Sequence, residues 1–149
     1  MREILFRGRT KDVKWHNGWY VKATKPMKTG SKQHEDWIVS GFSANGGWVT
    51  PLSRYAVDGD TVGQYTGLKD KNGVMIFEDD IVRFEWSFRE YKRFENFVVR
   101  FSNHAAFLLH PILESNNLWD VTFEKNYKEN FYEVIGNIYD NLELLKEES

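Results

Sequence analysis

The sequence predicts a mainly β protein with a few short helical turns, and three observations support this fold class. Aromatic residues make up 16% of the 149 residues, and their broad rings pack well across the pleated surface of a sheet. Turn signals of the Asn-Gly and Asp-Gly kind recur at short intervals along the chain. Apolar residues alternate with polar ones or gather in short runs, so a helical period is weak almost everywhere.

Seven strands are expected where β-branched and aromatic residues lie between turn signals. They cover residues 19–21, 37–39, 47–49, 62–65, 81–84, 97–101 and 131–135. The turn signals are Asn17-Gly18, Thr29-Gly30-Ser31, Asn45-Gly46-Gly47, Asp58-Gly59, Asn72-Gly73, Ser102-Asn103 and Asn116-Asn117. Short helical turns are expected at 77–80, whose acidic side chains suit a turn start, and at 141–148, where leucines hold a terminal turn.

The chain is expected to form one domain, because it contains no Pro/Gly/Ser-rich linker, low-complexity tract or clear repeat. A subdivision near residue 60 is the break that composition favours. Residues 1–59 then form a basic, Gly-rich β-meander, and residues 60–149 form a small SH3-like barrel or a partly open barrel. Residues 85–96 are a charged, aromatic insertion, expected to be a long hairpin or a mobile loop.

The formal net charge of −2 hides a gradient along the chain. Residues 1–32 contain nine Lys/Arg against two acidic residues, a net charge of +7, whereas residues 114–149 contain nine acidic residues against three lysines, a net charge of −6. Attraction between the two ends, or two solvated faces, explains this polarity. Head-to-tail contact between subunits, or a face that binds a polyanion, explains it as well.

Composition excludes several classes of protein. The chain has no cysteine, which rules out disulfides, thiolate nucleophiles and cysteine-ligated metal sites. No apolar run approaches the roughly 20 residues of a membrane helix, and no signal peptide is evident, so we expect a cytoplasmic protein without a membrane partner. Phosphate-loop and dinucleotide-binding motifs are missing, so no cofactor is expected.

Asp58 and Asp60 give the sharpest indication of catalysis. The stretch 57–62 fits the Asp-x-Asp-x-[Thr/Val] pattern of phosphoaspartyl hydrolases, in which one carboxylate attacks phosphorus and the other protonates the leaving oxygen. That mechanism also needs magnesium and a parallel sheet with crossover helices, and neither the helices nor the length is evident here. A simple Asp-Gly turn explains the same residues.

Three consecutive carboxylates, at Glu78, Asp79 and Asp80, could supply oxygen ligands to a hard cation. Consecutive side chains rarely point the same way, however, and the spacing of a calcium loop is missing. Asp80 ahead of an apolar run is also typical of a cap before a strand. No metal site is therefore predicted from this stretch.

Two aromatic and basic regions make nucleic-acid binding the main alternative, because small β-barrels commonly stack bases on rings and track phosphates with cations. The candidate contact residues of the first region are Arg83, Trp86, Arg89, Tyr91, Lys92 and Arg93. The amino-terminal third adds Arg2, Arg7, Arg9, Lys11, Lys14, Trp15 and Trp19. Three glutamates dilute the first region, however, and the pI of about 6.1 is below that of a dedicated binder. Aromatic side chains in a core with charges outside also explain both regions.

Three segments, residues 1–8, 60–84 and 133–141, resemble the YopX family of phage and prophage proteins. The most specific strings are Gly-Gln-Tyr-Thr-Gly-Leu-Lys-Asp at 63–70 and Gly-Asn-Ile-Tyr at 136–139. The resemblance implies a phage or prophage origin, a mostly β fold and no assigned activity.

The same segments carry local predictions. Residues 69–73 are expected to close a hairpin, and Gly136-Asn137 to form a bulge in the last strand. Where this chain has Glu78-Asp79-Asp80, the family pattern reads Glu-Gly-Asp. The family glycine implies a positive φ, which an aspartate at position 79 tolerates at some cost in strain.

The function expected is that of a non-enzymatic accessory protein that binds itself as a homo-oligomer or binds a host or phage macromolecule. A single-stranded nucleic-acid-binding protein is the alternative, and salt-dependent affinity that is lost on changing Arg89, Lys92 and Arg93 to alanine would distinguish it. A metal-dependent phosphohydrolase centred on Asp58 and Asp60 is the second alternative. It predicts magnesium-dependent turnover that Asp58→Asn abolishes.

Overall fold

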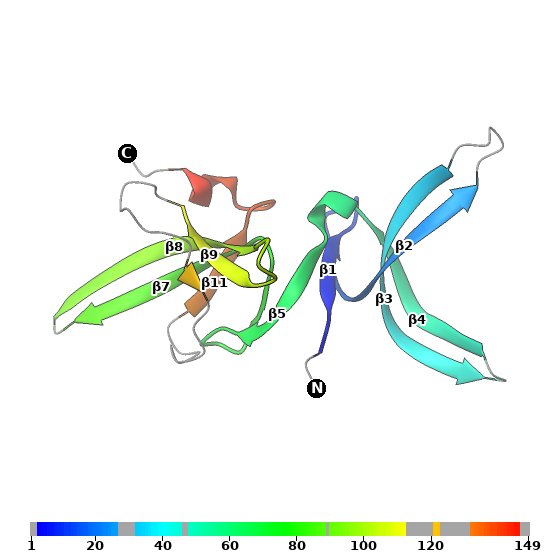
Figure 1. Cartoon of the computed structure of the whole chain (residues 1–149), viewed down its shortest axis with the longest axis horizontal. Helices are drawn as coiled ribbons and strands as arrows, with labels where there is room; N and C mark the ends of the chain where they lie inside the picture. Colours follow the sequence, from blue (N-terminus) through cyan, green and yellow to red (C-terminus); the bar gives the residue numbers. More distant parts are fainter. Residues whose placement is uncertain are drawn as a thin grey trace. The chain divides into compact units, whose positions relative to one another are not determined.

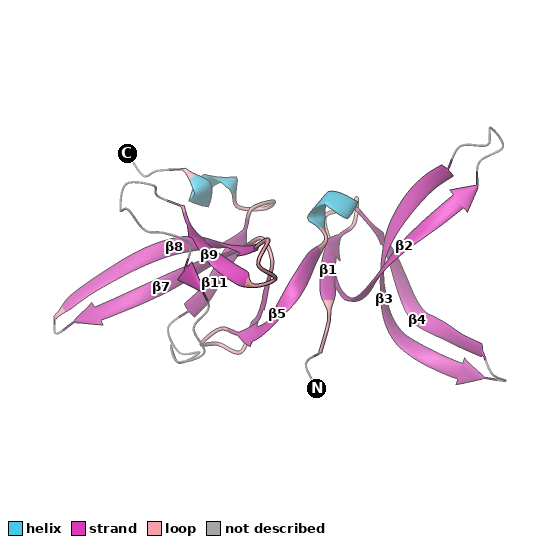
Figure 2. Cartoon of the chain, in the orientation of Figure 1, coloured by secondary structure: helices cyan, strands magenta, loops and turns pink. Residues whose placement is uncertain are grey.

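Strands dominate the computed structural model, which describes residues 3–26, 32–45, 48–88, 90–112, 121–122 and 132–146 (Figure 2). Within these ranges there is no α-helix, and the helical elements are two 3-10 turns. The prediction of a mainly β fold is therefore confirmed. A helix long and apolar enough to span a membrane is not found among the residues that the structure describes.

The chain forms two compact units, Met1–Tyr65 and Thr66–Ser149, and strand β5 begins in the first and ends in the second. The elements of the first unit are β1 (Phe6–Arg9), β2 (Trp15–Pro26), β3 (Lys32–Asn45), β4 (Trp48–Val57), the 3-10 turn η1 (Gly59–Thr61) and the start of β5 (Gly63–Lys69). These strands lie in the order β4-β3-β2-β1-β5 (Figure 1), and the neighbouring strands pair in antiparallel fashion. Consecutive strands β1 to β4 pair with one another, so the predicted meander is confirmed.

The turn predicted at Asn17-Gly18 is wrong. Asn17-Gly18 does not form a turn but lies inside β2, where Gly18 is paired with Phe6. A Cβ atom on Gly18 would lie 2.1 Å from the backbone oxygen of Val39. The glycine is needed because β2 approaches the backbone of β3 closely, which no other side chain permits.

One face of the first sheet is its packed side. Ile38 is fully buried there, and alternation along the strands places Phe6, Tyr20 and Tyr55 on the same side. The rings of Phe6 and Tyr20 lie 5.8 Å apart. Because successive residues of a strand point to opposite faces, the intervening residues of β1 to β4 form the other side of this sheet.

The second unit contains a five-stranded antiparallel sheet in the order β10-β9-β8-β7-β11. Its elements are the end of β5, β6 (Met75–Phe77), β7 (Asp80–Phe88), β8 (Tyr91–Phe101), β9 (Phe107–Pro111), β10 (Val121–Thr122), β11 (Tyr132–Asn137) and the 3-10 turn η3 (Leu142–Leu145). One buried cluster joins these strands and consists of Ile76, Val82, Phe84, Phe97, Val99, Leu109 and Tyr132. Strands β6, β7, β8, β9 and β11 all contribute to this core, as expected for the predicted partly open barrel. Residues 85–88 and 91–96 of the predicted insertion lie in the paired strands of the long β7–β8 hairpin.

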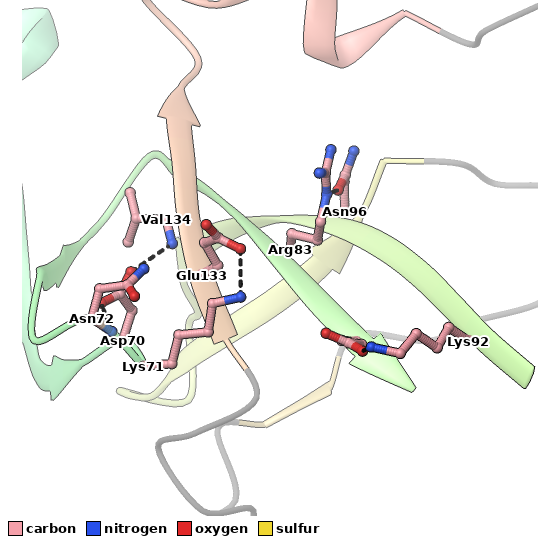
Figure 3. Close-up of polar contacts among 9 residues, drawn as sticks. Asp70, Lys71, Asn72, Arg83, Lys92, Asn96, Glu133 and Val134 are labelled. Atoms are coloured by element: carbon pink, nitrogen blue, oxygen red, sulfur yellow. Dashed lines mark hydrogen bonds and ion pairs between the residues drawn. The ribbon is translucent and has the colours of Figure 1, made fainter. Parts of the chain in front are cut away.

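Asp70 organises the turn between β5 and β6 (Figure 3). Its Oδ1 accepts hydrogen bonds from the backbone N–H groups of Asn72 and Val74 at 2.8 and 2.9 Å. Its Oδ2 accepts one from the N–H of Val134 at 3.0 Å, so the same buried carboxylate also fixes β11. The predicted hairpin is confirmed, and Gly73 supplies the positive φ of 81°.

Asp79 has a φ of 66°, which confirms the backbone conformation implied by the family glycine. Its carboxylate accepts hydrogen bonds from Nη1 of Arg100 at 2.5 Å and from the hydroxyl of Tyr139 at 2.8 Å. These contacts hold a residue type for which this conformation is strained. The neighbouring Asp80 is buried and accepts the N–H of Phe77 at 2.7 Å, so both carboxylates stabilise the turn. The predicted bulge in β11 is also confirmed, because its register shifts between Val134 and Gly136.

Candidate binding surface

The turn from Thr10 to Lys14 brings Arg9 and Trp15 opposite each other at the start of the β1–β2 pair. The hydroxyl of Thr10 donates to Asp12 Oδ1 at 2.5 Å, and Lys14 Nζ lies 2.9 Å from Asp12 Oδ2. These two contacts, the hydroxyl first, lower the pKa of Asp12 to about 2. The local sequence therefore fixes the register that places an arginine beside a tryptophan.

The 3-10 turn η1 and its N-cap Asp58 form hydrogen bonds with the end of β1. The N–H of Arg9 donates to the hydroxyl of Thr61 at 2.9 Å, and the carbonyl of Arg9 accepts the N–H of Asp58 at 2.9 Å. Asp58 also caps η1, since its side chain accepts the N–H of Asp60 at 3.2 Å. Both aspartates are exposed here, and the described strands β1 to β5 around them pair in antiparallel fashion, unlike the parallel sheet of a phosphoaspartyl hydrolase.

The side of the first sheet opposite Ile38 combines arginines with aromatic rings. Trp15, Trp19 and Val21 alternate along this side of β2, and Arg7 and Arg9 lie on the adjoining β1. The guanidinium carbon of Arg7 lies 4.7 Å from the ring centroid of Trp15, and that of Arg9 lies 6.0 Å away. Both distances place a cation against the face of one tryptophan.

Large apolar side chains are exposed on the same side, further along β2 to β4. Trp19 is 43% exposed, Phe42 47% and Leu52 68%, and the rings of Trp19 and Phe42 lie 5.0 Å apart. Strict alternation would place Phe42 on the packed side. The positive φ of Gly41, 63°, interrupts the alternation and accompanies the contact of Phe42 with Trp19.

We name this surface the aromatic face. Its residues are Arg7, Arg9, Trp15, Trp19, Val21, Phe42, Leu52 and Arg54. Arg54 belongs to it because β3 residue Val39 pairs with both Trp19 and Arg54. The charged members of this set are all arginines. On β3, alternation places Glu35 on the same side, and Glu35 pairs with Ala23, two residues past Val21 along β2.

The β7–β8 hairpin carries the region first proposed from the sequence, and its cations have local partners (Figure 3). Nε of Arg83 donates to Oδ1 of Asn96 at 3.2 Å. Lys92 Nζ lies 2.6 Å from Glu85 Oε1, and this hydrogen-bonded contact lowers the pKa of the Glu85 carboxyl. Arg93 pairs with Glu95 at 2.8 Å. These contacts reduce the net positive field of the hairpin surface.

The structure does not gather the six proposed residues on one described surface. The register and alternation place Arg83 and Lys92 on one side of the hairpin and Arg93 on the other. Trp86 lies in β7 and Tyr91 in β8, but their side chains lie outside the described part, as does the whole of Arg89. Their role in binding stays a prediction.

Of the second region proposed from the sequence, the structure brings Arg7, Arg9, Trp15 and Trp19 together, whereas Lys11 and Lys14 lie in the β1–β2 turn and Arg2 lies outside the described residues. Phe42, Leu52 and Arg54 were not predicted. The even spacing of Trp15, Trp19 and Val21, which places them on one side of a strand, was the available signal for β2. The pairing with β3 and β4 is set by register, which a single sequence does not give.

Two antiparallel sheets, one with an aromatic and cationic face, define a mainly β protein with a candidate contact surface. The chain belongs to the YopX family, because the family described as YopX protein matches residues 6–146. A crystal structure of protein EF1440 from Enterococcus faecalis is similar to this chain, with 25% sequence identity and a TM-score of 0.58. The match covers 98% of this chain and 100% of that protein. A search of curated proteins found no match.

Proposed function

We propose that this member of the YopX family is a non-enzymatic binding protein that contacts a macromolecule through the aromatic face. The exposure of Trp19, Phe42 and Leu52 on one side of one sheet carries the proposal. Scattered apolar residues are normal on a surface, but contiguous ones beside cations are typical of interaction sites. Family membership supports an accessory role in a phage or prophage, exercised in the cytoplasm of the bacterial host.

Site-specific photocrosslinking tests this proposal with a matched pair of positions. Phe42 and Phe101 are 47% and 48% exposed, and each contacts one other ring, that of Trp19 or of Phe107. Benzoylphenylalanine at position 42 is expected to give a reproducible adduct in bacterial cells, whereas the same group at position 101 gives none. Absence of an adduct at position 42, or equal adducts at both positions, contradicts the proposal.

Self-association is a second candidate function, favoured by the charges of the two units. Met1–Tyr65 contains ten Lys/Arg against six acidic residues, a net charge of +4, and Thr66–Ser149 contains ten against sixteen, a net charge of −6. Opposite charges on two units suit head-to-tail contact between copies. Light scattering at micromolar concentration is expected to show an oligomer that dissociates as salt is raised. A monomer at low salt overturns this candidate.

A further inference from the structure

We infer that the aromatic face binds single-stranded nucleic acid. This inference rests on the proposed function and names the chemical class of the partner. Three features of the first unit support it: exposed rings on neighbouring strands, cations that surround them, and a backbone that holds both in place.

The rings provide the stacking surface. Trp19 on β2 and Phe42 on β3 lie 5.0 Å apart, and each leaves more than two fifths of its surface exposed. Their planes are inclined by 52°, so the two rings form one exposed aromatic cluster with differently oriented faces. Unpaired bases stack on such rings without a sequence requirement, because every base has a π face. Bases inside a duplex are already stacked, so we expect a preference for single strands.

The arginines provide charge complementarity to phosphates. Arg54 is exposed, and it lies across β3 from Trp19 because both residues pair with Val39. Arg9 is half-buried against Trp15 at the β1 end of the face. Arg7 is 9% exposed, so it acts as a fixed positive charge close beneath the surface. The whole first unit has a net charge of +4 and the second −6, so a polyanion is attracted to the first unit and repelled by the second.

The backbone around these side chains is already ordered. Both backbone groups of Arg9 are hydrogen-bonded at 2.9 Å, to Thr61 of η1 and to its N-cap Asp58, and Trp15 follows the hydrogen-bonded turn of Thr10 and Lys14. Gly18 lets β2 pack closely against β3 at Val39, the residue that pairs with Trp19. A surface held in this way loses little conformational freedom on binding, which favours affinity.

Fluorescence anisotropy of the full chain with labelled oligonucleotides tests the inference. The probes are oligo-dT and oligo-rU of about 20 nucleotides and a duplex of the same length, each at about 50 and about 200 mM salt. Binding to both single strands is expected to exceed binding to the duplex and to weaken as salt rises. The dT and rU arms show whether DNA or RNA is preferred.

Variants locate the contact. Trp19→Ala is expected to weaken binding by about fivefold or more, the usual effect of removing one stacking ring. Phe94→Ala is the control, because Phe94 is an exposed ring, 56%, beside the cation Arg83 in the other unit. We expect it to change affinity by less than about twofold. Trp19→Phe keeps a ring and should retain most of the affinity, which separates loss of stacking from loss of folding.

The outcomes distinguish this inference from the proposed function. No single-strand binding at low salt, with a protease-sensitive and nuclease-resistant adduct at position 42, overturns the nucleic-acid inference and supports a protein partner for the same face. Loss of binding with Phe94→Ala and not with Trp19→Ala moves the site to the second unit and overturns the inference. A nuclease-sensitive adduct at position 42 supports both the inference and the proposed function.

Discussion

The aromatic face and the β7–β8 hairpin both combine rings with cations, but they differ in the residues that strand pairing places beside the cations. On the hairpin, Lys92 and Arg93 lie within 2.6 and 2.8 Å of glutamates. On the aromatic face, Arg7 lies 4.7 Å from the ring of Trp15, and the described charged members are arginines. Similar compositions therefore give two surfaces on which the strands bring different residues beside the cations.

The difference arises from register and alternation. Glu85 is opposite Phe94 and Ser87 is opposite Lys92, so Glu85 and Lys92 share one side of the hairpin. The residues of β1 and β2 that share this side include no acid, and they are Arg7, Arg9, Trp15, Asn17, Trp19, Val21, Ala23 and Lys25. A count of charges in the sequence treats both regions alike, whereas the pairing of strands decides which charges are neighbours.

Gly18→Ala is expected to have the largest effect, and it acts on the first unit, whose sheet carries the aromatic face. The added Cβ would lie 2.1 Å from a backbone oxygen, so β2 and β3 must separate, at a cost of more than about 3 kcal/mol in the free energy of unfolding. Gly73→Ala in the second unit is the control. It meets no atom within 4 Å and costs about 1 kcal/mol through its positive φ. Urea unfolding followed by residue-specific NMR signals measures both, and a larger loss for Gly73→Ala contradicts the packing described here.

Asp79 offers a second test, in the unit that contains the hairpin. Asp79→Ala and Asp79→Gly remove the same contacts with Arg100 and Tyr139, but only alanine keeps a side chain at a φ of 66°. We expect the alanine variant to be less stable than the glycine variant by about 1 kcal/mol. Thermal and urea unfolding compare them directly. Equal stability would mean that the turn is not strained.

The contact of Tyr20 with Asp36 predicts a change with pH in the first unit. The tyrosine hydroxyl donates to Asp36 Oδ1 at 2.5 Å, and this hydrogen bond, with partial burial, raises the pKa of Tyr20 from 10.0 to about 12. Because the pKa is higher in the folded state, the stabilisation is complete below pH 10 and is lost as pH rises through about 12. Absorbance titration of the wild type and of Tyr20→Phe isolates this group. A Tyr20 transition near pH 10 would contradict the contact.

The smallest effect is expected at the hairpin cations. Lys92→Gln with Arg93→Gln removes two surface ion pairs whose cations are more than 60% exposed. Pairs of this kind contribute less than about 0.5 kcal/mol each, so stability should hardly change. We expect oligonucleotide affinity to fall by less than about threefold. A loss of affinity of tenfold or more would indicate that the hairpin, and not the aromatic face, binds the oligonucleotide.

Much of the fold could be predicted from local sequence. The Asn72-Gly73 hairpin and the positive φ of Asp79 follow from turn chemistry, and the strands at 81–84 and 97–101 follow from aromatic and β-branched runs. These features depend on a few neighbouring residues, so a single sequence contains the necessary information.

The rest depends on contacts between distant residues. Phe6–Arg9 is basic and contains a glycine, yet it is the strand β1 because β2 and β5 pair with it on both sides. Gly18 follows an asparagine, which favours a turn, but close packing against Val39 makes it part of a strand. The aromatic face was only half predicted for the same reason, since Phe42 joins Trp19 through the φ of Gly41.

An NMR titration of the full chain with oligo-dT tests the central claim most directly, because it reports on both surfaces in one experiment. The largest changes in backbone signals are expected at Arg9, Trp15, Trp19 and Phe42, with small changes at Arg83, Lys92 and Arg93. The opposite pattern, with the largest changes along the β7–β8 hairpin, would contradict the assignment of binding to the aromatic face.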